Sequence, residues 1–185
     1  DLVKDGLSDF EIIDSNPRYI QQLDKIENVR QILRYEQFKN CFRELDISYI
    51  TGETGAGKTR SVMEKYGYRN VYRVTDYDHP FDSYKGQDVI VFEEFRSSLK
   101  IQDMLNYLDG YPCELPCRYN NKLACFTKVY IITNIPFNQQ YINIQAESKE
   151  TWKAFCRRIH HFFTCTKALG MQEETEWVQM TCFEK

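Results

Sequence analysis

The sequence has no long run of apolar residues and no excess of basic charge. None of the hydrophobic stretches in its 185 residues approaches the roughly 20 that cross a bilayer, so we expect no membrane partner. It has 24 lysine and arginine residues against 27 aspartate and glutamate residues, a formal net charge of −3. Proteins that coat duplex DNA without specificity carry a clear basic excess. Any contact with nucleic acid must therefore come from a local cluster of cations or from a ring of repeated subunits.

Paired cysteine motifs are also missing. The seven cysteines are Cys41, Cys113, Cys117, Cys125, Cys156, Cys165 and Cys182. Cys113 and Cys117 are close in sequence, but no C-x-x-C or histidine pair completes a set of four zinc ligands. We therefore expect reduced, mostly buried thiols in a cytosolic or nuclear protein, and neither a disulfide framework nor a zinc site.

The chain has no apolar signal segment, and it begins with Asp1 in place of methionine. We therefore expect an intracellular protein, and a fragment or processed piece from which an upstream domain is missing. The length suits one sizeable core with a small appendage.

The first forty-odd residues are expected to be helical. Asn16-Pro17 combines a cap residue with a proline in the first turn, which is a helix start signal. Apolar residues then recur every three or four positions, at Ile20, Leu23, Ile26, Val29 and Leu33. Such a stripe usually faces a core. Because it forms a separate block here, we expect a small helical subdomain over residues 1–44.

Strands and helices are expected to alternate over residues 45–185. The expected strands are 46–51, 70–75, 87–95, 128–134, 160–165 and 176–182, and the expected helices are 58–67, 99–110 and 150–159. Four apolar residues in succession within 87–95 are typical of a strand that is covered on both faces. The alternation predicts an α/β fold with a mostly parallel central sheet.

A glycine-rich loop with the sequence GETGAGKT follows the first expected strand and precedes a helix, the context that a phosphate loop requires. Its backbone N–H groups would converge on phosphates beside the positive end of the helix. Lys58 is expected to reach the β- and γ-phosphates, and Thr59 to place its hydroxyl on Mg²⁺. The predicted nucleotide-binding residues are Gly52, Glu53, Thr54, Gly55, Ala56, Gly57, Lys58 and Thr59.

Two of the expected strands end in polar residues. A carboxylate pair at Glu93 and Glu94 is costly to bury without a cation, which favours a functional role. By position, Glu93 would coordinate magnesium through water and Glu94 would be the general base. Asn134 ends the strand 128–134 and is expected at the carboxyl edge of the sheet, where it would position the attacking water or contact the γ-phosphate.

Two basic segments lie away from the loop. Arg157 and Arg158 follow a helix, and either one is a candidate to stabilise charge on the γ-phosphate of an adjacent subunit; a solvated surface pair is the alternative. The segment RYNNK places Arg118 and Lys122 around polar turn formers, which suits contacts with phosphates. Tyr119 between them is a candidate to stack on a base.

Together these motifs resemble the superfamily 3 helicase domain, a branch of the AAA+ P-loop ATPases. More narrowly, they resemble the replication-initiator (Rep) proteins of circular single-stranded DNA viruses and related bacterial plasmids. Four motifs in the family's order carry the resemblance: GETGAGKT as Walker A, FDSYKGQDVIVFEEF as the lead into Walker B, YPCELPCRYNNKLACFTKVYIITN as the B′ segment and motif C, and FCRRI as the arginine-finger segment. The resemblance covers about residues 45–165, and the helical block stands in the place of the family's oligomerisation subdomain.

The resemblance implies a ring-forming, hexameric DNA helicase that uses ATP and Mg²⁺ and moves 3′ to 5′ in rolling-circle replication. Arg118 occupies the position of the basic residue in the B′ loop, which lines the central channel and touches single-stranded DNA. The implied location is the host nucleus for a eukaryotic virus and the cytoplasm for a bacterial plasmid or virus.

The sequence departs from the family at two points. Many relatives have aspartate where Glu93 stands, so direct and water-mediated metal contact both stay open. Full-length relatives also carry an upstream nicking domain with a His-hydrophobic-His metal site. His79, His160 and His161 do not form that motif, and we expect no nicking activity in this segment.

Three other functions remain as alternatives. An RNA-directed ATPase or helicase stays open, because phosphate contacts by RYNNK carry no information about the sugar. A nucleotide-dependent switch is disfavoured because the only Asn-Lys, Asn121-Lys122, continues as Leu-Ala and forms no N-K-x-D guanine motif. A small-molecule kinase fits poorly with paired carboxylates at a strand end and with an arginine supplied to another subunit.

Overall fold

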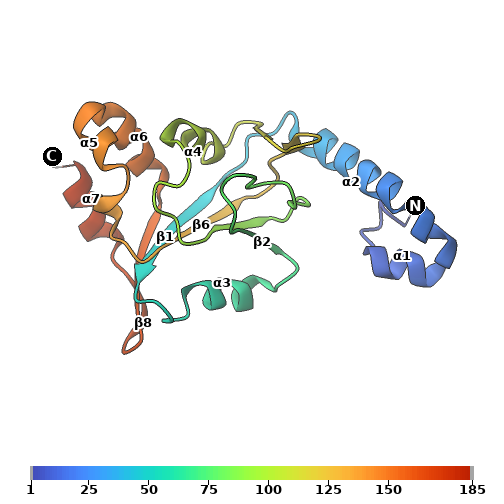
Figure 1. Cartoon of the computed structure of the whole chain (residues 1–185), viewed down its shortest axis with the longest axis horizontal. Helices are drawn as coiled ribbons and strands as arrows, with labels where there is room; N and C mark the ends of the chain where they lie inside the picture. Colours follow the sequence, from blue (N-terminus) through green and yellow to red (C-terminus); the bar gives the residue numbers. More distant parts are fainter. Residues whose placement is uncertain (1, 184–185) are drawn as a thin grey trace.

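The computed structural model describes residues 2–183. Figure 1 shows N-terminal helical segments beside a twisted sheet with helices on both faces. The three segments are α1 (Asp9–Ser15), the 3₁₀ helix η1 (Pro17–Gln22) and α2 (Leu23–Phe38). The Asn16 side chain accepts the backbone N–H of Arg18 at the start of η1. The expected start at Asn16-Pro17 is confirmed, although the first turns are 3₁₀ and the α-helix begins only at Leu23.

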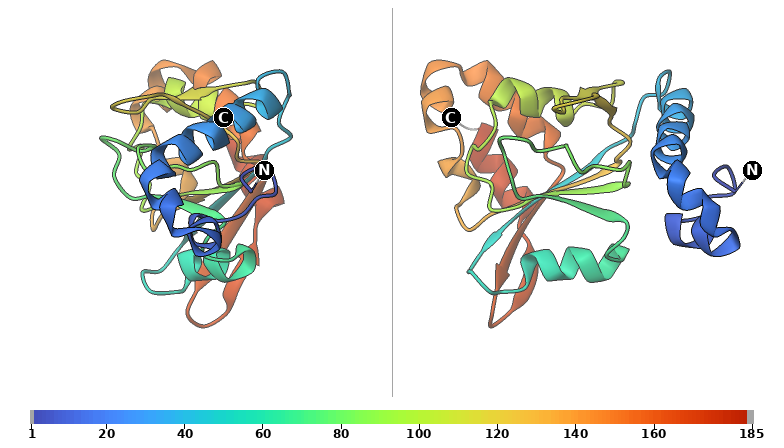
Figure 2. Two further views of the ribbon diagram at one scale, coloured as in Figure 1. Left: turned by 90° about the vertical axis from the view of Figure 1, so that its right-hand side faces the viewer. Right: turned by 45° about the vertical axis from the view of Figure 1, so that its right-hand side comes forward.

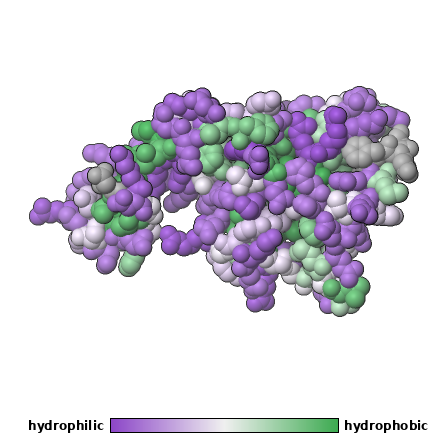
Figure 3. All heavy atoms as spheres, turned by 180° about the vertical axis from the view of Figure 1, so that it is seen from behind, coloured by the Kyte–Doolittle hydropathy of each residue, from purple (hydrophilic) through white to green (hydrophobic). Residues whose placement is uncertain are grey.

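The apolar stripe of this helical block is mostly exposed, contrary to the usual pattern. Ile26 is 8% exposed, whereas Ile20 is 60% and Val29 is 42% exposed. The reason is visible in Figure 2, where the block projects from one side of the sheet domain and little of it is covered. Figure 3 shows apolar side chains of the block on the surface among charged ones.

The central sheet has six strands in the order β2-β3-β6-β1-β7-β8. The strands are β1 (Asp46–Gly52), β2 (Val71–Val74), β3 (Val89–Phe92), β6 (Lys128–Ile132), β7 (His161–Thr166) and β8 (Gly170–Glu173). The first five in the sheet order run parallel, and β8 pairs antiparallel with β7. The predicted α/β fold with a mostly parallel sheet is confirmed.

Helices cover both faces of the sheet, as successive strand residues require. On one face, α3 (Lys58–Tyr66) packs over a cluster that includes Ile50 and Val62. The other face carries an aromatic cluster that includes Tyr49 and Phe155. It is covered by α4 (Ile101–Tyr107), α5 (Ile142–Glu147) and α6 (Lys149–Arg158), above the sheet in Figure 1.

The C-terminal expectation was wrong: residues 176–182 lie in a helix, α7 (Thr175–Phe183), and form no strand. Trp177, Val178 and Thr181 line one pocket together with Phe162. Positions 177, 178 and 181 have the spacing of residues on one face of a helix. On the side away from β1, β7 pairs with β8, a strand that the sequence did not indicate. None of the described helices is both long and apolar enough to span a membrane.

The cysteine expectation is met in part. Cys125, Cys156 and Cys165 are buried, Cys113 and Cys117 are intermediate, and Cys41 is exposed; Cys182 lies outside the residues whose side chains are described. Burial raises the pKa of the Cys125 and Cys113 thiols, which favours the neutral form.

Candidate nucleotide site

The phosphate loop needs glycine for reasons that its geometry makes explicit. Gly52, Gly55 and Gly57 all have positive φ, at 137°, 77° and 88°. A Cβ at Gly52 would lie 2.0 Å from the carbonyl oxygen of Cys165 on the neighbouring strand β7. Only a residue without a side chain therefore allows β1 to run beside β7 up to the point where the loop begins.

Lys58 begins α3 and lies under the loop with only 6% of its surface exposed. Its Nζ donates to the carbonyl oxygens of Gly52 and Glu53, at 2.8 Å each. A lysine ammonium has three N–H donors, and phosphate oxygens can replace these carbonyls as acceptors. The ammonium group therefore already lies where the loop closes, which suits the predicted contact with the β- and γ-phosphates.

Glu93 directly follows β3 and is 8% exposed, with a donor on each carboxylate oxygen. Thr59 Oγ1 donates to Oε2 at 2.8 Å, and Arg73 Nε donates to Oε1 at 2.7 Å. Arg73 lies on β2, next to β3 in the sheet. Arg73 is not among the residues predicted from the sequence; the one signal for it is a cation inside the apolar strand VYRV.

The residues at this point fit a magnesium ion. The hydroxyl oxygen of Thr59 and the carboxylate oxygen of Glu93 meet at 2.8 Å beside the phosphate loop. Mg²⁺ is usually bound by one or two such protein oxygens together with phosphate oxygens and water. Tyr77 donates its hydroxyl to the Glu93 carbonyl at 2.7 Å. Burial, and secondly the charge of Glu93, raise the pKa of Tyr77, so its hydroxyl stays a donor.

Glu94 turns away from the sheet. The strand expected over 87–95 ends at Phe92, because Glu94 adopts a left-handed conformation with φ of 47°. Its side chain is exposed, and within the described residues it makes no side-chain hydrogen bond. An exposed carboxylate one residue beyond the buried one can approach a water molecule at the sheet edge, as a general base requires.

Asn134 lies at the same edge. The β1–β6 register pairs Ile50 with Ile132, and the residues two positions further on, Gly52 and Asn134, line the same pocket. Its Oδ1 accepts a hydrogen bond from Arg96 Nη2 at 2.8 Å. Asn134 is among the residues predicted from the sequence, whereas Arg96, which follows the FEEF motif directly, is not.

The two arginines at the end of α6 have different surroundings. Arg158 forms an ion pair with Asp109 at 2.8 Å and donates to the carbonyl of Ala154. Arg157 is exposed and has no hydrogen bond or ion pair within residues 2–183. These contacts make Arg158 a structural residue and leave Arg157 as the available cation.

The end of α6 lies near the amino ends of the parallel strands, whereas the phosphate loop follows the carboxyl end of β1. The backbone N–H of His160 donates to the carbonyl of Ile47, near the beginning of β1. Gly52 lies five residues further along β1 than Ile47. At ~3.3 Å per residue, the end of α6 and the start of the phosphate loop are therefore separated by roughly 16 Å. The structure therefore keeps Arg157 away from the phosphate loop of its own chain.

The RYNNK segment lies at the end of a small antiparallel hairpin of β4 (Glu114–Leu115) and β5 (Lys122–Leu123), which the sequence did not predict. Tyr119 in its loop is 92% exposed. Asp82 holds the base of the loop: its carboxylate accepts from the backbone N–H and the Nε of Arg118, and its carbonyl accepts from Lys122 Nζ. The three predicted nucleic-acid residues therefore lie on one protruding hairpin.

The geometry defines a P-loop nucleotide-binding domain, since a parallel strand, a glycine loop and a helix meet a buried acid from a second strand. Residues 48–134 match a family model described as RNA helicase. Over 89 residues, 48% of this chain, the sequence is 27% identical to the replication-associated protein of Canary circovirus. Over 108 residues, 55% of this chain, it is 30% identical to the replication protein of Onion yellows phytoplasma (strain OY-M).

These matches confirm the resemblance that the motifs indicated, to the superfamily 3 helicase domain of Rep-type replication proteins. The matched segments span only 30% and 28% of the two curated relatives. The family match contains the phosphate loop, the acidic pair, the RYNNK segment and Asn134, and it ends before the arginine segment.

Proposed function

We propose that this domain is the ATP-dependent DNA helicase part of a replication initiator, which hydrolyses ATP between the subunits of a ring. The observation that carries this proposal is the placement of Lys58, Thr59, Glu93 and Asn134 at one edge of the sheet and Arg157 at the other. A subunit of this kind holds one half of an ATP site and can offer the missing arginine to its neighbour. We take the ring to be a hexamer and the direction to be 3′ to 5′, on the family resemblance.

In the proposed reaction the loop Gly52–Thr59 binds the phosphates, and Lys58 exchanges its carbonyl partners for phosphate oxygens. Thr59 and Glu93 would hold Mg²⁺, which when bound offsets the negative charge of the phosphates. Glu94 accepts a proton from the attacking water, and Asn134 positions that water or the γ-phosphate. Arg157 of the adjacent subunit stabilises the charge that develops on the γ-phosphate.

The hairpin supplies the proposed contact with DNA. Arg118 and Lys122 are held by Asp82, and a DNA phosphate would compete for the same donors. Tyr119 at the exposed tip is placed to stack on a base. Several copies of this hairpin around a channel would let a chain of net charge −3 bind a polyanion.

The Lys58→Ala change tests the proposal. We expect ATP hydrolysis to fall by about 100-fold or more and unwinding of a DNA duplex to be lost, since the loop loses its cation. Arg69→Ala, at an exposed arginine outside the site, serves as the matched control and should leave both rates unchanged. A protein that stays monomeric with ATP and DNA, and that unwinds DNA without Lys58, would contradict the proposal.

RNA is the second candidate substrate, favoured by the description of the matching family as RNA helicase. The contacts expected from Arg118 and Lys122 are with phosphates, which DNA and RNA share. ATP hydrolysis should therefore be compared in the presence of single-stranded DNA and RNA of one sequence. Stronger stimulation by DNA supports the first proposal, and stronger stimulation by RNA replaces it with the second.

A further inference from the structure

Arg96 lies at the nucleotide edge of the sheet, and none of the roles described above includes it. Its guanidinium donates from Nη2 to Oδ1 of Asn134 at 2.8 Å. The two residues are 38 positions apart and come from the segments that follow β3 and β6. Neighbouring parallel strands bring these segments together beside the phosphate loop.

The turn that carries Arg96 is held in a strained conformation. Glu94 and Ser97, which bracket it, are both left-handed, with φ of 47° and 53°, although neither is glycine. Non-glycine residues keep such conformations only where their surroundings hold them, and they concentrate at functional sites. The strained backbone therefore indicates that the residues of this turn have a functional role.

Gln140 holds the turn from beneath. Its side chain is fully buried, and its Oε1 accepts from the backbone N–H and the hydroxyl of Ser97, at 2.7 and 2.9 Å. Its Nε2 donates to the carbonyl of Phe95 and to the hydroxyl of Tyr49. Phe95, also buried, donates its N–H to Ile132 at the end of β6. The backbone on both sides of Arg96 is thus fixed to the core, and its side chain starts from a defined position.

The contact with Arg96 also decides which way the Asn134 amide faces. Arginine has only donors, so the atom of Asn134 that meets it must be the carbonyl oxygen. The NH₂ group of the amide is then directed away from Arg96, and both of its N–H donors remain for another acceptor. A phosphate oxygen or a water molecule at the sheet edge is an acceptor of this kind.

We propose that Arg96 is a positioning residue, which acts within its own subunit by holding Asn134 with its N–H donors turned toward the γ-phosphate. Without Arg96 the amide can rotate and present its oxygen, which repels phosphate oxygens. The inference rests on the proposed ATPase function, because it describes how that same site is arranged. It differs from the role of Arg157, which would come from the adjacent subunit.

A set of four variants in the full chain tests the proposal: Arg96→Ala, Arg96→Lys, Asn134→Ala and the double variant Arg96→Ala with Asn134→Ala. We expect Arg96→Ala to lower kcat for ATP hydrolysis by about tenfold, because misplaced catalytic groups cost rate. The KM for ATP and the binding of a non-hydrolysable ATP analogue should stay within about twofold, because the loop still binds the phosphates. Arg96→Lys keeps one donor and should recover most of kcat.

The double variant separates positioning from direct action. If Arg96 acts through Asn134, its removal changes nothing once Asn134 is gone, and the double variant hydrolyses ATP as fast as Asn134→Ala. If the loss of kcat in the double variant instead equals the product of the two single losses, Arg96 acts independently of Asn134 and the proposal is wrong. An unchanged kcat for Arg96→Ala, like that expected for the Arg69→Ala control, would overturn it as well.

The outcome for wild-type protein distinguishes this inference from the proposed function. If wild-type protein hydrolyses ATP and the Arg96→Ala variant has an equal kcat, the inference about Arg96 is wrong and the proposed function is unaffected. Wild-type protein that neither binds nor hydrolyses ATP removes the proposed function and this inference with it. Thermal unfolding of each variant confirms that it is folded, since Arg96 and Asn134 are exposed and their loss should leave stability nearly unchanged.

Discussion

At the scale of single residues, Glu93 shows how a buried carboxylate beside the phosphate loop is kept in place. Each of its oxygens accepts one hydrogen bond, from Thr59 on α3 and from Arg73 on β2. A buried carboxylate without partners would carry a large desolvation penalty. Arg73 supplies the positive charge that a magnesium ion would also supply, so the two can substitute for each other in part.

Arg73→Ala tests this interpretation. We expect the free energy of unfolding to fall by about 1 kcal/mol without nucleotide, discounted because the Arg73 side chain is 47% exposed. With Mg²⁺ and a non-hydrolysable ATP analogue the difference from wild type should shrink, since the ion restores positive charge near Glu93. Thermal and denaturant unfolding under both conditions measure the effect.

Lys128→Ala is the control, because Lys128 pairs with Asp88 at the opposite ends of the strands, away from the phosphate loop. Its effect on stability should be the same with and without Mg²⁺ and the analogue. If both variants respond to the ligands equally, Arg73 has no special relation to the metal position.

At the scale of elements, the RYNNK hairpin and the lead into β3 form one unit through Asp82. Hydrogen bonds from the backbone and then the side chain of Arg118 lower the pKa of Asp82. A lowered folded-state pKa means that the pair contributes at neutral pH and is lost as the pH falls through that lowered value. Protonating Asp82 therefore frees Arg118 only under acid conditions, and in the proposed complex at neutral pH a DNA phosphate would have to compete with Asp82 for Arg118.

Arg118→Ala should weaken binding of single-stranded DNA at every sequence and lower the slope of log affinity against log salt by about 0.7, the value for one phosphate contact. Tyr119→Ala should cost about 1–3 kcal/mol of binding free energy, with little change in the salt slope, since it removes stacking. Fluorescence anisotropy at several salt concentrations measures both. Equal salt slopes for wild type and Arg118→Ala would show that Arg118 touches no phosphate.

The end of α6 is the second element with a specific prediction. Arg157→Ala should abolish ATP hydrolysis without lowering stability, whereas Arg158→Ala should lower stability because Asp109 loses its partner. Mixing Arg157→Ala with Lys58→Ala subunits should restore activity in about a quarter of sites if the subunits assemble at random, because each site takes its arginine from a neighbour. No recovery on mixing, with assembly confirmed, would argue against a shared site.

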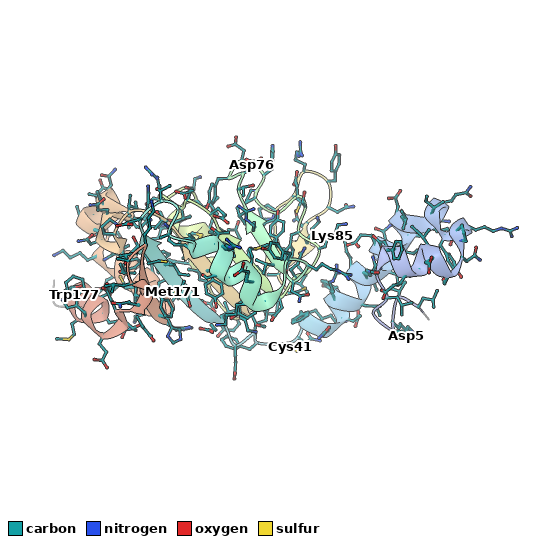
Figure 4. The ribbon with its side chains drawn as sticks, turned by 90° about the horizontal axis from the view of Figure 1, so that it is seen from below. Asp5, Cys41, Asp76, Lys85, Met171 and Trp177 are labelled. Atoms are coloured by element: carbon teal, nitrogen blue, oxygen red, sulfur yellow. The ribbon has the colours of Figure 1, made fainter. Side chains whose placement is uncertain are left out.

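At the scale of the whole molecule, the helical block leaves several large apolar side chains exposed. Ile20, Ile32 and Phe10 are 60%, 62% and 76% exposed, and the block lies on one side of the sheet domain. Figure 4 shows Lys85 on the side of the sheet domain that faces the block, with Met171 and Trp177 at the far end. The family resemblance places oligomerisation in this block, and exposed apolar side chains are consistent with that prediction.

The double variant Ile20→Asp, Ile32→Asp should prevent assembly, as measured by sedimentation in the presence of ATP and single-stranded DNA. Thermal stability of the monomer should change little, because both side chains already face solvent. Ile142→Asp, at an equally exposed apolar residue on α5, is the control and should leave assembly intact. If the double variant assembles like wild type, oligomerisation lies elsewhere.

The sequence by itself determined what depends on neighbours in the chain. Apolar runs set the positions of β1, β3 and β6, and Asn16-Pro17 set the start of the 3₁₀ helix η1. The phosphate loop was readable because its glycines and Lys58 act within eight consecutive residues. The error at 176–182 arose because a short apolar segment fits a strand or a helix equally well. In the structure Trp177, Val178 and Thr181 come from one helix and line a pocket together with Phe162.

Only the tertiary structure decided which distant side chains meet. Arg73 reaches Glu93 across 20 residues, Asp82 reaches Arg118 across 36, Arg96 reaches Asn134 across 38 and Asp109 reaches Arg158 across 49. Each pairing depends on which strands lie side by side, and β6 enters the sheet between β1 and β3. No local pattern encodes that order, because it results from packing the whole sheet between its two helical layers.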